Sequence, residues 1–491
     1  MSVGLAERFA PLLARGRLIS VVDGSTVDVS LVEIGAAAER LARALPPATS
    51  RPNAILISLS HGPAFLRSVF ATWLSGNAIA PTSRRATLTE LRPLLAAMQP
   101  VAVLCERSDR RFTELGYREV SRDEAPALLV KDDAEAVLPL RSGDAWLATT
   151  SGSTGTPKVA VIPSDAILAN CRAVSRHLQI DENDRVLVFT PPHFTYALVQ
   201  LLSAGLSGAT VLAWPHGLGV PRVAADFARE GGCTGISANP TAYEMLLPAF
   251  GAPYAALRYA LSAGQPLSLR LAGALGAVFP EAARHSGYGC TENTNRISFA
   301  PVEPGLFRDG IASVGWPIAG TRIRLTSAGE VVLSGESLME GYLGDLIDGA
   351  PRSEEFATGD LAALGASGEL YLTGRNRNRI NVGNEMVDPE EVEGALRGID
   401  GVVDCAVGGI DDEMLGEAIV ALVVLAKPDV DVGAELARRL RPSRRPQHVA
   451  PVSPTDIPRT EYGKVDRVSL KGVLVECFGP PGDAKRRATR L

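Results

Sequence analysis

The sequence of 491 residues contains few cysteines and few aromatic residues, and its acidic residues only slightly outnumber its basic ones. Its six cysteines lie far apart without a Cys-x-x-Cys pair, which argues against a zinc site and against a disulfide framework. Its net charge is -6, so it offers no basic surface for a nucleic-acid backbone or an anionic membrane. No apolar run approaches the roughly 18 residues of a membrane span, and residues 1–18 are interrupted by Arg and Glu where a signal peptide would be apolar. These absences predict a cytoplasmic protein that acts on small molecules.

Apolar patterning along the chain predicts an α/β fold. Residues 31–45 carry apolar side chains at helical spacing, whereas residues 54–59 form a short apolar run that is typical of a buried strand. Helix-like and strand-like segments go on alternating, which is the pattern of parallel sheets covered by helices. Further expected helices are 65–76, 196–208 and 390–399, and further expected strands are 101–105, 185–190, 209–214 and 418–426.

The pattern of apolar and turn-forming residues changes near residue 315. Short β-like segments at 321–326, 330–335 and 369–374 are separated by Gly, Ser and Asp turns and predict a β-rich lobe. The last residues combine Pro, Gly and basic charge without apolar spacing. We therefore expect a large amino-terminal domain of parallel α/β subdomains and a β-rich lobe (1–375), a small mobile α+β domain (376–475) and a flexible tail (476–491).

The segment Thr149–Lys158, TTSGSTGTPK, concentrates hydroxyl groups, two glycines and a lysine after a strand-like segment. Glycines let backbone N–H groups approach anionic oxygens, the hydroxyls add donors, and Lys158 supplies a positive charge. It is not a Walker loop, because Pro157 stands where that motif needs Gly and Val159 where it needs Ser or Thr. The segment predicts a different phosphate-binding loop, with a Ser/Gly linker as the alternative.

Four further motifs follow this loop: YGCTE at Tyr288–Glu292, ATGD at Ala357–Asp360, GR at Gly374–Arg375 and PRTEYGKVDR at Pro458–Arg467. Together with the loop they resemble the motifs of the adenylate-forming superfamily, which contains acyl-CoA synthetases, luciferases and nonribosomal peptide adenylation domains. They occur in the order and at the spacing of that family. The resemblance implies a ligase that joins a carboxylic acid to the AMP part of ATP, releases pyrophosphate, and passes the acyl group to a thiol of CoA or of a carrier protein.

The resemblance also implies roles for individual residues. Lys464 bridges the carboxylate and the α-phosphate, Thr291 donates to that phosphate, and Glu292 holds Mg²⁺. The reaction needs such cations and donors, because the carboxylate and the phosphate repel each other. Arg377 aligns with the hinge about which the small domain rotates between the half-reactions. The residues expected to bind the nucleotide are Thr150, Ser151, Gly152, Ser153, Thr154, Gly155, Lys158, Gly264, Gln265, Tyr288, Gly289 and, at the ribose, Asp360 and Arg375.

Three segments resemble the walls of the acid pocket in that family. The segment PPHFTYAL lacks the Phe-Asp pair that anchors the amino group of an α-amino acid, so another kind of acid is expected. The aromatic residues of this segment can enclose a flat ring, which predicts an aryl acid; core packing is the alternative reading of these residues. The residues expected to line the pocket are His193, Phe194, Tyr196, Asn239, Ala263, Gly264, His285 and Ser286.

Three positions after Gly374 depart from the commonest family pattern: Asn378 replaces Asp, Asn381 replaces Lys, and Asn384 replaces Gly. In thioester-forming relatives that Gly leaves room for the pantetheine arm, and a side chain at Asn384 reduces the room. The acceptor therefore stays open between a thiol and an amine or another nucleophile. A nucleotide-binding relative without turnover is a further alternative. No carrier domain follows the last motif, so a carrier protein is expected as a separate chain.

Overall fold

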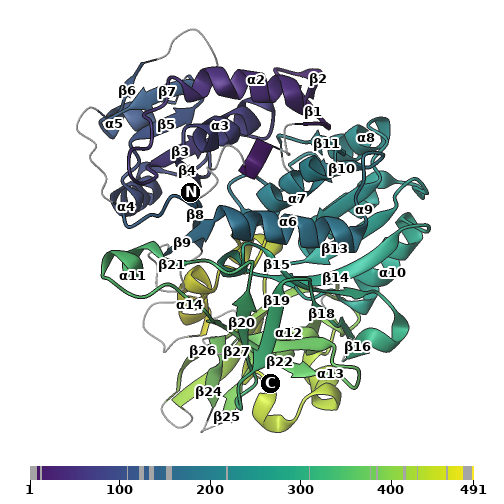
Figure 1. The fold of residues 1–491 in the computed structure, drawn as a ribbon. Coiled ribbons are helices and arrows are strands. Elements are labelled where there is room, and N and C mark those ends of the chain that lie inside the picture. Colours follow the sequence, from purple (N-terminus) through teal and green to yellow (C-terminus); the bar gives the residue numbers. More distant parts are fainter. Residues whose placement is uncertain are drawn as a thin grey trace.

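The structure of the protein, a computed structural model, describes residues 8–10, 14–107, 109–120, 126–131, 138–150, 158–216, 219–308, 310–375, 378–382, 385–412, 416–427, 430–460, 463–478 and 489–490. Figure 1 shows the purple amino-terminal segments at the top, the teal sheet and helices in the middle, and the green and yellow strands at the bottom. Within these residues, every helix is too short or too polar to cross a membrane.

The largest sheet has nine strands, in the order β18 (Trp316–Pro317), β15 (Arg296–Pro301), β14 (Ala283–Gly289), β13 (Tyr259–Ala263), β12 (Gly235–Ala238), β10 (Arg185–Val188), β11 (Thr210–Ala213), β1 (Arg17–Val22) and β2 (Ser25–Ser30). The strands from β14 to β1 run parallel, which confirms the predicted α/β fold. One face is covered by α6 (Ser164–Leu178) and α7 (Thr195–Leu206), and the other by α8 (Pro221–Glu230), α9 (Pro240–Phe250) and α10 (Leu269–Val278). Alternate strand residues enter the two cores, as Val186 and Leu187 of β10 do.

A second sheet has eight strands, in the order β21 (Gly341–Tyr342), β9 (Lys158–Pro163), β8 (Asp144–Thr150), β4 (Ala78–Pro81), β3 (Ala54–Ser58), β5 (Ala102–Cys105), β7 (Ala127–Val130) and β6 (Arg118–Glu119). Its helices are α2 (Leu31–Ala42), α3 (Pro63–Leu74), α4 (Leu88–Met98), α5 (Arg111–Glu114) and α11 (Leu343–Ile347). Helix α2 begins at a capping box in which Ser30 and Glu33 bond each other's backbone N–H groups. Strands β8 and β9 form a hairpin in which Thr150 pairs with Lys158. Thr149, Thr150 and Lys158 of the predicted phosphate loop belong to these two strands, and residues 151–157 lie outside the described residues.

The predicted β-rich lobe is a four-stranded antiparallel sheet, in the order β19 (Thr321–Leu325), β20 (Glu330–Gly335), β22 (Phe356–Leu364) and β23 (Leu370–Arg375), beside the two-stranded ribbon of β16 (Phe307–Arg308) and β17 (Ile311–Ala312). Apolar side chains of its strands pack under Tyr288 and Ile297 of the nine-stranded sheet. The lobe therefore extends the large sheet at the end that carries the YGCTE motif.

The carboxy-terminal sheet contains β24 (Ile380–Val382), β25 (Glu385–Val387), β26 (Val402–Asp412), β27 (Gly416–Leu425), β28 (His448–Pro451) and β29 (Thr489–Arg490). Its helices are α12 (Pro389–Arg397), α13 (Val432–Arg439) and α14 (Arg467–Phe478). The predicted boundary at 375/376 falls between β23 and β24, whereas α14 continues to Phe478, beyond the predicted domain end at 475. Thr489 and Arg490 pair with β28. The domain limits and the flexibility of the tail stay predictions.

Candidate active site

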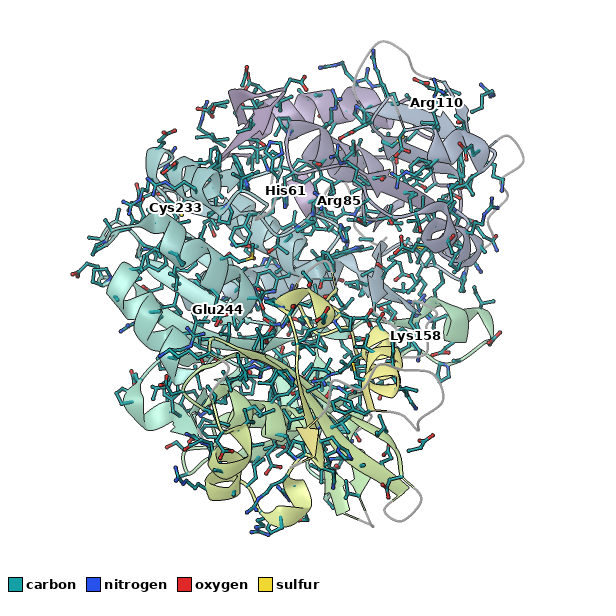
Figure 2. All side chains as sticks on the ribbon, turned by 180° about the vertical axis from the view of Figure 1, so that it is seen from behind. His61, Arg85, Arg110, Lys158, Cys233 and Glu244 are labelled. Carbon is teal, nitrogen blue, oxygen red and sulfur yellow. The ribbon has the colours of Figure 1, made fainter. Side chains whose placement is uncertain are left out.

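Several predicted site residues lie at the β8–β9 hairpin, at the end of β14, or where the carboxy-terminal loop contacts Gly264 and Thr241. The short 3-10 helix η2 (Thr291–Asn293) follows β14 and lies against both strands of the hairpin. Figure 2 shows Lys158 where the amino-terminal strands approach the yellow helix of the carboxy-terminal part. The Thr150 hydroxyl lies 3.5 Å from the carbonyl oxygen of Lys158. Outside the described residues lie Ser151, Gly152, Ser153, Thr154, Gly155, the hinge candidate Arg377 and Asn384.

Glu292 is held by a tyrosine from a distant part of the chain. The Tyr342 hydroxyl donates to Oε1 of Glu292 at 2.7 Å, and the Lys158 ammonium lies 4.6 Å from the centre of the Tyr342 ring. Strand β21 brings Tyr342 to this place, because Tyr342 pairs with Ala160 of β9. These three side chains join the phosphate-loop hairpin to the carboxylate that is predicted to hold magnesium.

The second carboxylate of the site, Asp360, is bound by Tyr288. The Tyr288 hydroxyl donates to Oδ2 of Asp360 at 2.5 Å, and both side chains are buried. Burial raises the pKa of Tyr288, so the hydroxyl keeps its proton and remains a donor. Asp360 pairs with Arg375 across β22 and β23. The backbone therefore places the two predicted ribose ligands opposite each other, although the side chain of Arg375 lies outside the described part of the chain.

The turn after β14 is constrained by close backbone contacts. A Cβ atom on Gly289 would lie 1.9 Å from the carbonyl oxygen of Asn295, so only glycine fits there. Thr294 has a φ of 61°, which is rare for a β-branched residue, and its hydroxyl donates to the carbonyl oxygen of Ser337 at 2.7 Å. The Thr291 hydroxyl lies 3.4 Å from the hydroxyl of Thr195 at the start of α7. These contacts hold the backbone from which Thr291 and Glu292 project.

The loop that carries Lys464 rests on the large amino-terminal part. Gly264 directly follows β13 and has a φ of +87°, and a Cβ there would lie 3.6 Å from Nζ of Lys464. The neighbouring residue Gly463 packs closely against Thr241 in the first turn of α9, because a Cβ on Gly463 would lie 2.6 Å from Cγ2 of Thr241. The backbone N–H and the hydroxyl of Thr241 both donate to Oε1 of Gln265, at 3.3 and 3.0 Å. Lys464 thus lies beside Gly264 and Gln265, two of the residues predicted to bind the nucleotide.

Arg459 stabilises the same loop from the carboxy-terminal side. Its guanidinium donates to the carbonyl oxygen of Gly463 and forms an ion pair with Asp404 of β26. Within the loop, the N–H of Thr460 donates to the carbonyl oxygen of Lys464 at 2.8 Å, and the N–H of Gly463 donates to that of Thr460 at 2.9 Å. The position of Lys464 is therefore set by a closed turn and not by a free chain.

The predicted pocket residues near α7 form an aromatic cluster. The ring centres of His193 and Phe194 lie 4.0 Å apart. The Tyr196 hydroxyl lies 2.8 Å from the hydroxyl of Ser237 in β12. Burial lowers the pKa of His193 to about 3 and that of the neighbouring His61 to about 4. Both rings are therefore neutral at neutral pH, and neither supplies a cation to a phosphate or a carboxylate.

The remaining predicted pocket residues occupy different surroundings. Asn239 caps α9, where its Oδ1 accepts from the N–H of Ala242 at 2.7 Å, and Ala263 is buried at the end of β13. His285 lies 5.2 Å from the ring of His177 in α6. Ser286 follows it in β14 and faces the opposite side of the sheet. At most one of these two β14 side chains can therefore line a pocket on a given face.

Comparison with known proteins identifies the family. The model of the AMP-binding enzyme family matches residues 14–343, and the model of the AMP-binding enzyme C-terminal domain matches residues 391–464. The chain belongs to the AMP-binding enzyme family. A sulfoacetate–CoA ligase of Cupriavidus necator is 30% identical over 85% of this chain and 86% of its own length, and a feruloyl-CoA synthase of an Amycolatopsis species is 30% identical over 92% and 94%. The fold is similar to that of an o-succinylbenzoate CoA synthetase from Bacillus subtilis, with a TM-score of 0.79 and 22% identity over 96% of this chain and 98% of that chain.

Membership of the AMP-binding enzyme family confirms the predicted class of enzyme, an adenylate-forming ligase that binds ATP. The individual residue roles stay predictions. Two side chains of the site region had not been singled out from the sequence, Tyr342 and Arg296. Arg296 had a detectable signal, because it is a charged residue at the start of the otherwise apolar segment RISFAP. Tyr342 had none, because its contact depends on strand pairing far along the chain.

Tyr342→Phe removes only the hydroxyl that bonds Glu292, and hydrogen bonds to charged groups are the stronger ones. We expect acid-dependent pyrophosphate exchange into ATP to fall by about 10-fold, with a raised requirement for Mg²⁺. Tyr117→Phe is the matched control, because it removes a buried hydroxyl bonded to the Pro100 carbonyl oxygen. If both variants have the same exchange rate and Mg²⁺ dependence, Tyr342 does not position Glu292.

Proposed function

We propose that the enzyme converts a carboxylic acid and ATP into an acyl-adenylate and pyrophosphate, and then transfers the acyl group to a thiol of CoA or of a separate carrier protein. The position of Lys464 is the observation that carries the proposal. Its ammonium lies against Gly264, at the surface where the carboxy-terminal loop contacts α9. A mobile cation at this junction is what the first half-reaction needs.

In the proposed first step, an oxygen of the carboxylate forms a bond to the α-phosphorus while the bond from that phosphorus to the oxygen of the leaving pyrophosphate breaks. Lys464 and Thr291 stabilise the negative charge on the α-phosphate oxygens, and Asp360 accepts hydrogen bonds from the ribose hydroxyls. Fixed placement of the two anions supplies much of the rate. Tyr288 and the closed turn of the Lys464 loop hold these groups before the substrate arrives.

Glu292 fits an Mg²⁺ ion that arrives with ATP. Magnesium is usually held by one or two carboxylates, while phosphate oxygens and waters complete its octahedral shell. In the described part of the chain, no group of three or more His, Cys, Asp or Glu side chains could hold a metal by itself. The donor set is therefore suited to a shared ion and not to a site built by the protein alone. Such an ion supplies positive charge near the departing pyrophosphate.

For the second half-reaction, we propose that residues 376–475 rotate against residues 1–375 about a hinge at Arg377, with 476–491 as a tail. The rotation withdraws Lys464 and admits the thiol. Two relatives whose names specify CoA as the acceptor support CoA here. None of the six cysteines forms a disulfide, which supports the proposal of a cytoplasmic location.

Benzoate is expected to support faster pyrophosphate exchange than heptanoate, because a flat ring gains contact with the His193–Phe194 cluster without losing rotamer freedom. Initial exchange rates with a panel of aryl and alkyl acids measure this. A clear preference for heptanoate would contradict the aryl class while leaving the ligase intact. Exchange with none of the acids would contradict adenylation. Thioester formation from preformed acyl-adenylate and CoA, followed in a single turnover, tests the acceptor.

A further inference from the structure

Arg296 is a buried positive charge that has only neutral partners among the described residues. It begins β15, and 3% of its surface is exposed. Its guanidinium carbon lies 3.8 Å from the centre of the Tyr196 ring, and its Nη2 donates to the hydroxyl of Ser237 at 3.0 Å. Its Nη1 donates to the side-chain oxygen of Asn295. Burial lowers the pKa of Arg296, yet the guanidinium starts so far above neutrality that it keeps its charge.

Three partly buried arginines of this chain form ion pairs with carboxylates. These pairs are Arg352 with Asp144 and Glu340, Arg467 with Glu393, and Arg258 with Asp184. Arg296 is more deeply buried than these three. A buried charge without a counter-charge is costly, and the partners of Arg296 among the described residues are all neutral.

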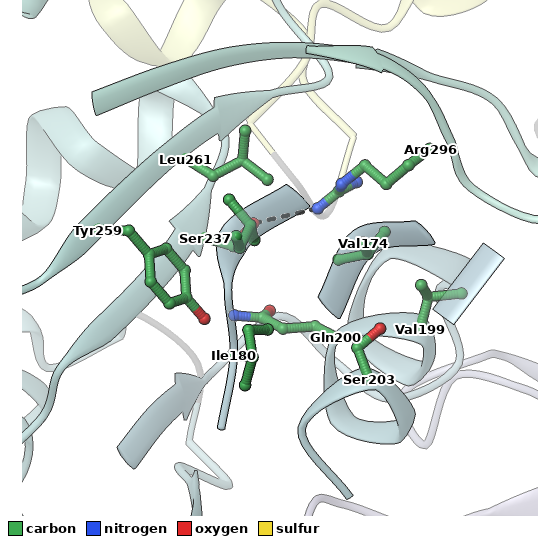
Figure 3. Close-up of a pocket in the computed structure, with 10 residues that line it drawn as sticks. Val174, Ile180, Val199, Gln200, Ser203, Ser237, Tyr259, Leu261 and Arg296 are labelled. Atoms are coloured by element: carbon green, nitrogen blue, oxygen red, sulfur yellow. Dashed lines mark hydrogen bonds between the residues drawn. The ribbon is translucent and has the colours of Figure 1, made fainter. Parts of the chain in front are cut away.

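The surroundings of the guanidinium leave polar groups unused. A cavity of about 10 Å³ borders it, enough for one water or one oxygen atom. Three of its lining residues have a buried polar atom without a partner: Nε of Arg296, Oε1 of Gln200 and Oγ of Ser203. Figure 3 shows the Arg296 side chain extending toward Ser237, while Gln200 and Ser203 lie across the cavity from the guanidinium. The other side chains that line the cavity are mostly apolar, so they offer these donors and acceptors few hydrogen-bond partners.

This cluster adjoins the candidate active site. Arg296 lies opposite Gly289 in the pairing of β14 with β15. Tyr196, whose ring covers the guanidinium, directly follows Thr195, and the Thr195 hydroxyl lies 3.4 Å from that of Thr291. Tyr196 is partly exposed, whereas Arg296 is buried behind it. The positive charge is therefore at the inner end of the region predicted to hold the acid.

We propose that Arg296 binds a second acidic group of the substrate, so that the enzyme selects acids with a carboxylate or sulfonate at the end away from the reacting carboxylate. This inference rests on the proposed function and specifies its substrate class. The partly exposed ring of Tyr196 turns aside to admit the acidic group, and the unused Nε donates to it. Arg296 is then a specificity-determining residue, while Lys464 and Thr291 act on the reacting carboxylate in every substrate.

The test uses matched acids that differ only in the second acidic group: succinate against butyrate, and benzene-1,3-dicarboxylate against 3-methylbenzoate. In the wild type, we expect the diacid of at least one pair to have a kcat/KM for pyrophosphate exchange about 10-fold or more above that of its partner. Arg296→Met should remove or reverse this preference, and Arg296→Lys should keep part of it. Arg258→Met is the control, because it breaks a different arginine pair and should lower the rates of both members of a pair equally.

Two results would overturn the inference: a wild-type preference for the methyl member of both pairs, or the same preference in the wild type and in Arg296→Met. If Arg296→Met does not fold, Arg296→Lys and the wild-type preference decide in its place. Exchange with no acid at all would contradict the proposed function. The anion site is then tested by thermal unfolding, in which succinate should raise the Tm of the wild type more than butyrate does; equal shifts would overturn the inference.

Discussion

Lys464→Ala is expected to slow acyl-adenylate formation by about 10²- to 10³-fold, the usual effect of removing one preorganised charged donor from a transition state. Its ammonium lies against Gly264 in the arrangement described above. Transfer from preformed acyl-adenylate to CoA should change far less, because the proposed rotation withdraws Lys464 before that step. Pyrophosphate exchange measures the first half-reaction, and single-turnover thioester formation measures the second.

Lys471→Ala is the matched control, since Lys471 is exposed on α14 in the same part of the chain. It should leave both half-reactions unchanged. Equal losses in the two half-reactions of Lys464→Ala would show that the lysine supports the structure of the loop, or that the carboxy-terminal part does not alternate between two positions.

Arg352→Met is expected to lower the free energy of unfolding by about 3–5 kcal/mol, because it leaves a buried carboxylate without its partner. Arg352 bonds both oxygens of Asp144, at 3.2 and 3.0 Å, and also pairs with Glu340 at 2.9 Å. The Asp144 side chain is only 2% exposed. The shift of the first urea-unfolding transition, with its slope, gives the change.

Arg324→Met provides the comparison, because Arg324 and Glu355 form an ion pair whose side chains are 55% and 50% exposed. Such surface pairs contribute about 0–1 kcal/mol. If the two arginine variants unfold at the same urea concentration, the Arg352 cluster is not a structural anchor.

The elements with strong local signals were predicted well from the sequence. The expected helix 196–208 is found as Thr195–Leu206, and the expected strand 185–190 as Arg185–Val188. Both have clear apolar periodicity, which depends on neighbouring residues only. The motifs identified the family for the same reason, since each is a short continuous segment whose residues act together.

The contacts between motifs could not be predicted from local patterns. Tyr342 reaches Glu292 only because β21 pairs with β9, and no periodicity specifies which strands pair. Strand alternation places the adjacent side chains of His285 and Ser286 on opposite faces of the sheet, so only one of these two predicted pocket residues can face a given side. The surroundings of Arg296 could not be predicted for a different reason, because the sequence does not show which charged groups lie near a given arginine in the fold.

The pairing of β21 with β9 also has a consequence for the order in which the protein folds during synthesis. Until residues 341–342 leave the ribosome, β9 is an open edge of the eight-stranded sheet, with unpaired backbone groups beside the phosphate-loop hairpin. Asp144 likewise has no ion pair with Arg352 until Arg352 has been synthesised. The amino-terminal sheet therefore closes late, through contacts of large sequence separation that form slowly. A nascent chain that ends before Arg352 leaves this sheet unfinished, so we expect nucleotide binding only after most of the polypeptide has been made.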